Sequence, residues 1–316
     1  MTAPLKQVPI KAPSRDPFRF EPVFVLATSR SYSSVVSTMI GQHPQLAALP
    51  ELKLFTYSTI AELEASLPRY WIERGMKHRS PGLVRAVAHF EFGSQTSEAL
   101  ACAGMWLRNR GDWSGADMLD FLLSHVRPRA GVEKSPENVE SDESLARLAA
   151  AYPKARYLHL TRHPVTTQRS AEEHVARTVP GFSLPDQPMS GIASWVETHC
   201  RILSFGENLP TDRYMRVKAE DLLNNADPHL RSIGTWLGLR VDDEAIETMK
   251  HPEASPFAFP GPADSGIIGG NDPGFLRDPV PHPVDTPPIL DRPPGWIGNE
   301  PLWQSTVELA ARLGYS

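Results

Sequence analysis

Short, continuous apolar runs recur along the chain between longer segments in which apolar residues follow a helical spacing. The clearest runs are 22–28, 46–49, 155–161 and 213–217, and 131–136 resembles the end of another strand. A short run rich in β-branched and aromatic residues is typical of a strand that a parallel sheet buries on both faces. The pattern therefore predicts several short, mostly parallel strands.

Segments with helical spacing lie between these runs. The expected helices are 35–42, 54–67, 82–92, 97–108, 114–126, 141–152, 165–177, 192–205 and 228–237. Strands that alternate with helices form βαβ units, so we expect an α/β fold, a three-layer α/β/α sandwich around a central, mostly parallel sheet. Residues 53–130 carry helical patterns with few strand signals, which predicts a helical insertion beside the sheet.

Two segments towards the ends of the chain are rich in proline. Residues 1–20 are polar and dotted with proline, and we expect a flexible tail there. Of the 31 prolines, 13 lie in 252–301, so this stretch must be irregular. Residues 21–316 are expected to form a single domain.

Composition narrows the class of protein. A net charge of -5 argues against a nucleic-acid partner, because such proteins usually carry a basic excess. The sequence has no run of about 18 apolar residues and no secretory signal pattern, so we expect neither a membrane span nor export. Cys102 and Cys200 lack metal or disulfide spacing, which favours the reducing cytoplasm. A homo-oligomer is compatible with these numbers.

Candidate chemistry lies where strands end. Thr28, Glu51, Lys134 and Arg162 each follow a predicted strand, and ligands of open α/β sheets bind beyond the carboxyl ends of the strands. The turn after the first strand leads into a helix, whose free N–H groups favour an anion. This turn consists of Ser29, Arg30, Ser31, Tyr32, Ser33 and Ser34. It lacks the GxxxxGK[ST] pattern of a Walker A loop, and an ordinary serine-rich helix cap is the alternative.

A second pair of residues suits a phosphate group. Arg162 ends a buried strand, and Ser170 lies eight residues later on the following helix. A guanidinium and a hydroxyl placed in this way can hold one phosphate from two sides. A surface arginine and an exposed helical serine are the alternative.

Five segments, taken in order, resemble the sulfotransferases that use 3'-phosphoadenosine-5'-phosphosulfate (PAPS). Residues 28–44 are similar to the family's 5'-phosphosulfate loop and helix, which close with His-Pro, and 158–170 to its 3'-phosphate motif. Glu-Lys-Ser-Pro at 133–136 resembles EK[ST]P, and 216–223 and 233–239 resemble the YEDL strand end and the FLGL helix end. The resemblance covers roughly residues 20–280 and implies a P-loop-like sulfotransferase fold.

The resemblance implies transfer of a sulfuryl group from PAPS to an acceptor hydroxyl, with 3'-phosphoadenosine-5'-phosphate (PAP) released and no metal required. In-line displacement at sulfur needs positive charge on the sulfuryl oxygens and on the leaving phosphate. Arg30, Lys134 and the loop N–H groups are the candidates, and Lys134 is also a candidate to protonate the leaving oxygen. The resemblance thus assigns the 29–34 loop, Arg162 and Ser170 to the nucleotide.

The reaction also needs a base for the acceptor proton. Glu51 stands 21 residues after Arg30, similar to the glutamate base of the tyrosylprotein sulfotransferases. A carboxylate at a helix N-terminus is the alternative reading of Glu51. His89, Glu91 and His174 are rival bases, since many family members use a histidine.

Tyr32 departs from the family pattern, which has glycine at this point of the loop. A tyrosine at positive φ would be strained. A negative φ, or a ring directed into the acceptor pocket, would remove the difficulty.

The proline-rich segment has a place in the resemblance as well. Residues 259–277 occupy the position of the family's C-terminal loop, which closes on the nucleotide. Gly269 and Gly270 would let the backbone approach a phosphate, and Arg277 would add charge. A solvated linker is the alternative. The match to the family's RKGxxGDW is loose.

The sequence leaves open two alternative functions and the chemical identity of the acceptor. A P-loop kinase or NTPase shares the architecture, and a non-catalytic PAP-binding protein would keep the fold without the chemistry. The acceptor pocket should be built from 53–130 and 179–191, and polyketide hydroxyls, sugars, lipids and phenols all fit that description. Trp195 and Tyr57 are candidates to stack on adenine, although core packing is the expectation for each.

Overall fold

The computed structural model describes residues 21–178, 190–290 and 300–316. The predicted tail 1–20, nearly all of the predicted loop 179–191 and the 291–299 part of the proline-rich segment lie outside the described residues. Among the described residues, no helix combines the length and the apolar character that crossing a bilayer requires.

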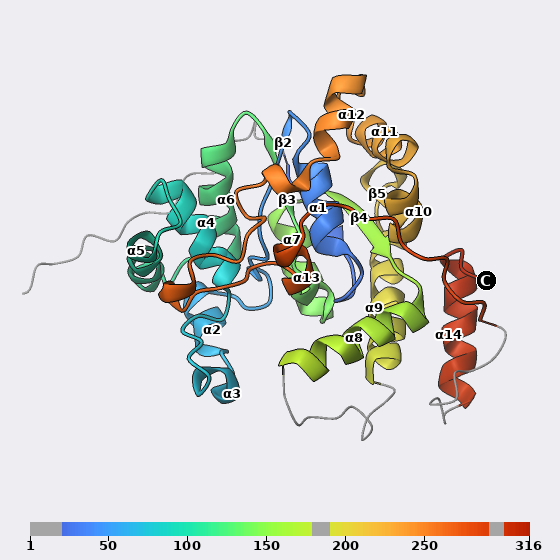
Figure 1. Cartoon of the computed structure of the whole chain (residues 1–316), viewed down its shortest axis with the longest axis horizontal. Helices are drawn as coiled ribbons and strands as arrows, with labels where there is room; N and C mark the ends of the chain where they lie inside the picture. Colours follow the sequence, from blue (N-terminus) through green and yellow to red (C-terminus); the bar gives the residue numbers. More distant parts are fainter. Residues whose placement is uncertain (1–20, 179–189, 291–299) are drawn as a thin grey trace, which may run out of the picture.

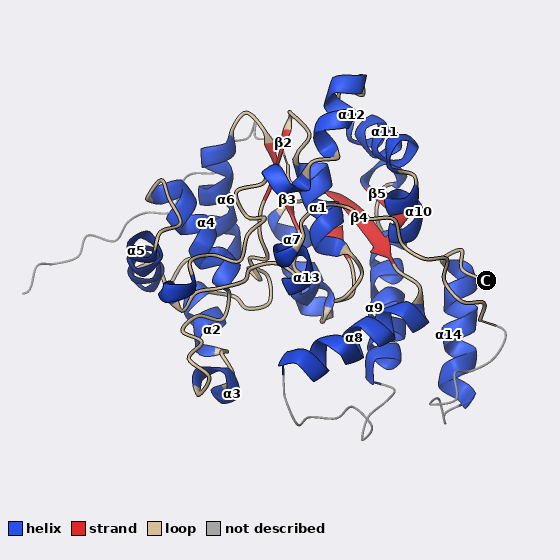
Figure 2. Ribbon diagram, in the orientation of Figure 1, coloured by secondary structure: helices blue, strands red, loops and turns tan. Residues whose placement is uncertain are grey.

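The central sheet has five strands in the order β2-β3-β1-β4-β5 (Figure 2). They are β1 (Val23–Leu26), β2 (Leu46–Ala48), β3 (Ala130–Glu133), β4 (Arg156–Thr161) and β5 (Tyr214–Lys218). Every neighbouring pair is parallel. The parallel sheet predicted from the apolar runs is therefore confirmed.

Strand β1 shows how the sheet is covered on both faces. Val23 and Val25 point to one cluster of buried side chains, whereas Phe24 and Leu26 point to another. The first face packs against α1 (Ser33–Gly41), α10 (Ala219–Asn224), α11 (Ala226–Leu237) and α12 (Asp243–Met249). The second packs against the helices of the insertion, α7 (Asp142–Ala151) and α9 (Ser190–Glu207). The expected three layers are present (Figure 1).

The predicted insertion is helical and lies to one side of the sheet (Figure 1). It contains α2 (Ile60–Ala65), α3 (Arg69–Ile72), α4 (Pro81–Glu91), α5 (Ser97–Arg108) and α6 (Gly115–Val126). The helix expected at 54–67 is only α2, because Thr59 caps its start by accepting from the N–H of Glu62 and Pro68 lies just beyond its end. The apolar spacing therefore predicted too long a helix, because it does not register the capping residue and the proline that limit α2.

The chain after β5 holds helices that the apolar pattern did not predict. These are α10, α12, α13 (Pro273–Arg277) and α14 (Glu300–Arg312). The first three span fewer than two helical turns, so an apolar spacing has no room to repeat in them, and α14 follows the proline-rich stretch. Tyr315, just after α14, places its hydroxyl 3.0 Å from both Thr161 Oγ1 and Glu220 Oε2. The end of the chain is thereby packed beneath the carboxyl end of β4.

Candidate active site

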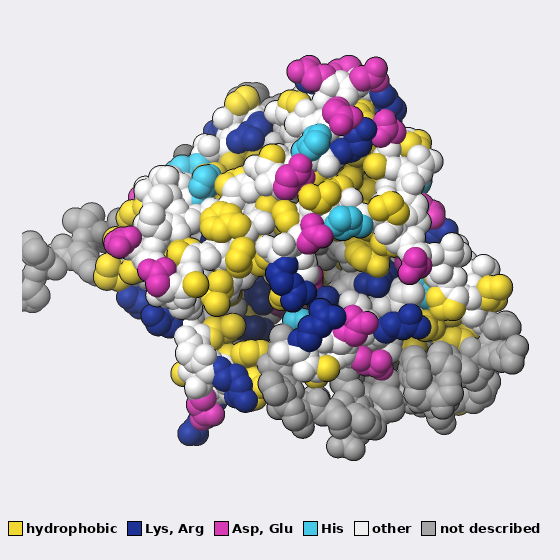
Figure 3. Space-filling view, viewed as in Figure 1, with side chains coloured by type: hydrophobic (Ala, Val, Ile, Leu, Met, Phe, Trp, Pro, Cys, Tyr) yellow, Lys and Arg dark blue, Asp and Glu magenta, His cyan; other side chains and the backbone are white. Residues whose placement is uncertain are grey.

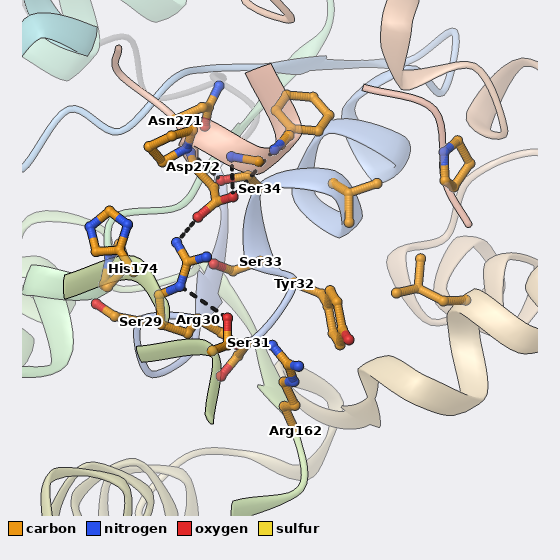
Figure 4. Close-up of a pocket in the computed structure, with 18 of the residues that line it drawn as sticks. Ser29, Arg30, Ser31, Tyr32, Ser33, Ser34, Arg162, His174, Asn271 and Asp272 are labelled. Atoms are coloured by element: carbon orange, nitrogen blue, oxygen red, sulfur yellow. Dashed lines mark hydrogen bonds and ion pairs between the residues drawn. The ribbon is translucent and has the colours of Figure 1, made fainter. Parts of the chain in front are cut away.

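The carboxyl ends of β1, β2, β3 and β4 meet at one edge of the sheet, where a cavity of about 520 Å³ opens. Figure 3 shows lysine and arginine side chains around the hollow in the middle of this face. The cavity is lined by Ser29, Arg30, Ser31, Tyr32, Ser33, Ser34, Glu51, Arg162, Ser170, His174 and Asp272, among others (Figure 4). Tertiary structure thus brings together most of the candidates that lie far apart in sequence.

The loop after β1 turns sharply to begin α1. Thr28 Oγ1 and the fully buried Ser31 Oγ lie 2.6 Å apart, and the N–H of Val36 donates to the carbonyl of Tyr32 at 3.1 Å. Tyr32 stands at the N-cap position of α1 and supplies no side-chain hydrogen bond there. A helix start without a side-chain cap leaves N–H groups for an anion.

The tight turn is made with positive φ at Tyr32 (57°) and also at Arg30 (67°). A negative φ at Tyr32, one of the two ways to avoid strain, is therefore wrong. A non-glycine residue in this region costs on the order of 1 kcal/mol or more. The Arg162 guanidinium carbon lies 4.0 Å from the centroid of the Tyr32 ring, and this cation–π contact offsets part of that cost (Figure 4).

Two arginines from different strand ends converge on this loop. Arg162 donates from NH1 to the Arg30 carbonyl at 2.7 Å, and its own carbonyl accepts from the buried Trp195 indole at 2.9 Å. Arg30 Nε donates to Ser170 Oγ at 3.3 Å. Burial lowers the pKa of both guanidinium groups, and Arg162 lowers that of Arg30 further. An anion bound between them would relieve this unfavourable grouping of charge.

Lys134 joins the loop to the candidate base. Its side chain is 1% exposed, donates from Nζ to Ser34 Oγ at 2.8 Å and forms an ion pair with Glu51. The backbone of Glu51 is held as well, because its N–H donates to the Gly270 carbonyl at 2.8 Å and its carbonyl accepts from Ser80 Oγ at 3.0 Å. The ammonium therefore lies at a fixed position between a loop hydroxyl and a carboxylate.

The rival bases occupy different places. His89, on α4, packs its ring against that of Phe257 with centroids 5.4 Å apart, and Glu91 accepts from the Trp106 indole at 3.2 Å. Neither lines the cavity: His89 is half-buried against Phe257, and Glu91 is exposed at the end of α4. His174 does line it, and burial together with the charge of Arg30 lowers the pKa of this imidazole.

The remaining candidates lie around the cavity rather than in it. Gly270 contributes its carbonyl to Glu51, and Gly269 and Gly270 both have positive φ, which only glycine adopts readily. Arg277 is exposed on α13. Trp195 is 1% exposed and belongs to the core, as expected, whereas Tyr57 is 37% exposed and lines no part of this cavity.

Sequence reasoning missed several residues of the cavity, among them the polar Asp272 and an apolar wall. Asp272 enters from the C-terminal segment and forms an ion pair with Arg30 (Figure 4). Asp272-Pro273 is a helix-start signal that would have located it. The apolar wall is built by Val35, Leu223, Phe275, Val280 and Val284.

A buried carboxyl group lies directly behind this site. Glu133 is 1% exposed and accepts hydrogen bonds from the Ser135 hydroxyl, the Asn138 amide (2.8 Å) and the N–H of Leu52. It thereby ties β3 to the segment that carries Glu51. Burial raises the pKa of Glu133 to about 7, although these hydrogen bonds and the neighbouring lysine act in the opposite direction.

We expect Glu133→Gln to stabilise the protein at pH 8 by about 1 to 3 kcal/mol and to change stability little at pH 5. Between pH 4.5 and about 7 the folded protein keeps a proton that the unfolded chain has lost, so the free energy of unfolding falls as pH rises. Urea unfolding at both pH values measures this, with Glu98→Gln on an exposed helix start as the control. A difference that does not grow with pH would refute it.

Comparisons with known proteins agree with this architecture. The model of the sulfotransferase family matches residues 22–243, more than half of the chain. No curated protein matches the chain. The sulfotransferase domain of the Synechococcus PCC 7002 olefin synthase has 22% identity and a TM-score of 0.69, over 97% of this chain and 98% of that one. A sulfotransferase domain from the curacin biosynthetic pathway has 19% identity and a TM-score of 0.70, over 94% and 99%. Identities this low show a shared fold.

Proposed function

Because the chain belongs to the sulfotransferase family, we propose that it transfers a sulfuryl group from PAPS to an acceptor hydroxyl and releases PAP. One observation carries the proposal. Lys134 Nζ connects Ser34, at the start of α1, with the carboxylate of Glu51. A single buried cation therefore touches both the loop suited to the donor anion and the group suited to the acceptor proton.

The donor nucleotide suits one half of the cavity. The α1 start and Arg30 would hold the 5'-phosphosulfate, and Arg162 with Ser170 would hold the 3'-phosphate. The apolar wall that begins at Val35 is a suitable surface for adenine, since a purine ring buries well against aliphatic and aromatic side chains. Two phosphate-sized groups and one ring are thereby accommodated without a Walker A lysine.

The acceptor would approach Glu51 from the side of the helical insertion. Glu51 takes the proton of the hydroxyl as its oxygen forms a bond to sulfur, and the bond between sulfur and the phosphate oxygen of the donor breaks in line. Positive charge from Lys134 and Arg30 stabilises the oxygens on which negative charge develops. The proton thus moves to Glu51, and the bonding electrons leave with PAP.

We expect PAP to bind at least tenfold more tightly than ATP with Mg²⁺, because the cavity has two separate anion positions and no Walker A loop. Isothermal titration of the full chain with each nucleotide measures the two affinities. Labelled PAPS with a panel of small phenols, sugars and aliphatic alcohols then tests transfer. Tight binding of ATP with Mg²⁺ and none of PAP would favour the kinase alternative instead.

A further inference from the structure

Asp272 lies on a short segment that is held from several sides. Arg85, 0% exposed on α4, donates from NH1 to the Gly269 carbonyl at 2.5 Å. Gly270 approaches Gly82 so closely that a Cβ built on Gly82 would lie 3.1 Å from the Gly270 Cα. The N–H of Asp272 then donates to Ser34 Oγ at 3.0 Å. The segment therefore cannot withdraw without breaking contacts to two other elements.

The side chain of Asp272 has two separate roles in this arrangement. Oδ1 accepts from the N–H groups of Gly274 and Phe275 at 2.8 and 3.2 Å, which caps the start of α13. Oδ2 forms the ion pair with Arg30 inside the cavity (Figure 4). The cap fixes the carboxylate, and the fixed carboxylate neutralises the arginine that the proposed reaction assigns to the donor.

We propose that Asp272 is a built-in counter-anion that competes with the donor nucleotide for Arg30, and so weakens the binding of PAPS and PAP and speeds product release. The inference rests on the proposed function. Arg30 already donates a hydrogen bond from Nε to Ser170 and pairs NH1 with Asp272. A bound phosphosulfate would therefore receive hydrogen bonds only from the remaining N–H groups of this guanidinium.

Electrostatics gives the sign of the effect. The Asp272 side chain is 28% exposed and that of Arg30 is 21% exposed, so water screens their interaction only in part. A donor that brings two more anionic groups next to the fixed carboxylate is repelled by it. Because the cap and the Ser34 bond keep Asp272 in place, this repulsion persists when the nucleotide is bound.

The test is Asp272→Asn, which removes the charge and keeps a side chain that caps helices equally well. We expect PAP to bind about tenfold more tightly, with most of the change in a slower dissociation rate. Asp278→Asn is the matched control, since Asp278 lines the same cavity but bonds to His282 at 2.8 Å and not to Arg30. We expect it to change PAP affinity less than twofold.

Isothermal titration and stopped-flow displacement of PAP give affinity and dissociation rate, and a thermal melt checks the fold. If Asp272→Asn unfolds, Asp272→Ser also caps the helix without charge and takes its place. Unchanged or weaker PAP binding by the uncharged variant would overturn the inference while the proposed function stands. An equal gain from Asp278→Asn would also overturn it. Absence of PAP binding by the wild-type chain would overturn both.

Discussion

Replacing Glu51 with glutamine should lower kcat by about 10²- to 10⁴-fold while PAP affinity changes less than threefold. A glutamine has nearly the same shape but cannot accept the acceptor proton, and a positioned general base contributes about this factor. PAP binding is preserved because the proposed nucleotide contacts come from the α1 start, Arg30, Arg162 and Ser170. Labelled PAPS with the best acceptor of the panel gives kcat, and titration gives PAP affinity.

Two results would contradict the proposal that Glu51 is the general base. One is unchanged turnover in Glu51→Gln. The other is a comparable loss in His174→Asn alone, because His174 also lines the cavity and the low pKa of its imidazole leaves it neutral and able to accept a proton. Loss of PAP binding together with turnover would instead indicate that Glu51 supports the shape of the site.

Replacing Lys134 with methionine should lower kcat by about 10²- to 10³-fold. The ammonium is the buried group that contacts both Ser34 and Glu51, and removal of one preorganised donor to developing negative charge typically costs this much. Methionine fills most of the lysine volume. The same assay measures kcat, and PAP titration separates binding from transfer.

Lys53→Met provides the matched control for Lys134. Lys53 forms a comparable ion pair, 2.6 Å from Nζ to Glu137 Oε1, with a side chain 16% exposed, but its ammonium has no bond to Ser34 or Glu51. We expect kcat within about threefold of wild type. Similar losses of kcat in both variants would mean that breaking any ion pair at this edge of the sheet lowers turnover. The proposed role of Lys134 in stabilising developing negative charge would then be unsupported.

The apolar runs were sufficient to predict the sheet. The unbroken apolar sequence of Val23–Leu26 predicts a strand that is buried on both faces. The positions of Thr28, Glu51, Lys134 and Arg162 then followed, since residues after parallel strands share one edge. The short helices α10, α12 and α13 could not be predicted in the same way, because fewer than two turns do not display a period.

Local sequence also predicted the residues of the loop but not its conformation. The departure from glycine identified Tyr32 as the residue whose φ was uncertain. Only the folded structure shows that this φ is positive and that Arg162, 130 residues later, packs on the ring. A conformation that is unfavourable on its own persists when distant contacts fix it.

The sequence alone determined which residues follow each strand, and with them the loop proposed to bind an anion, the lysine and the candidate base. Tertiary structure decided which of them meet. It placed Lys134 between Ser34 and Glu51, packed His89 against Phe257 outside the cavity, and brought Asp272 to Arg30 across 242 positions of the chain. The reason is physical: secondary structure follows from short-range spacing, whereas charge pairing in a cavity depends on how separate elements pack.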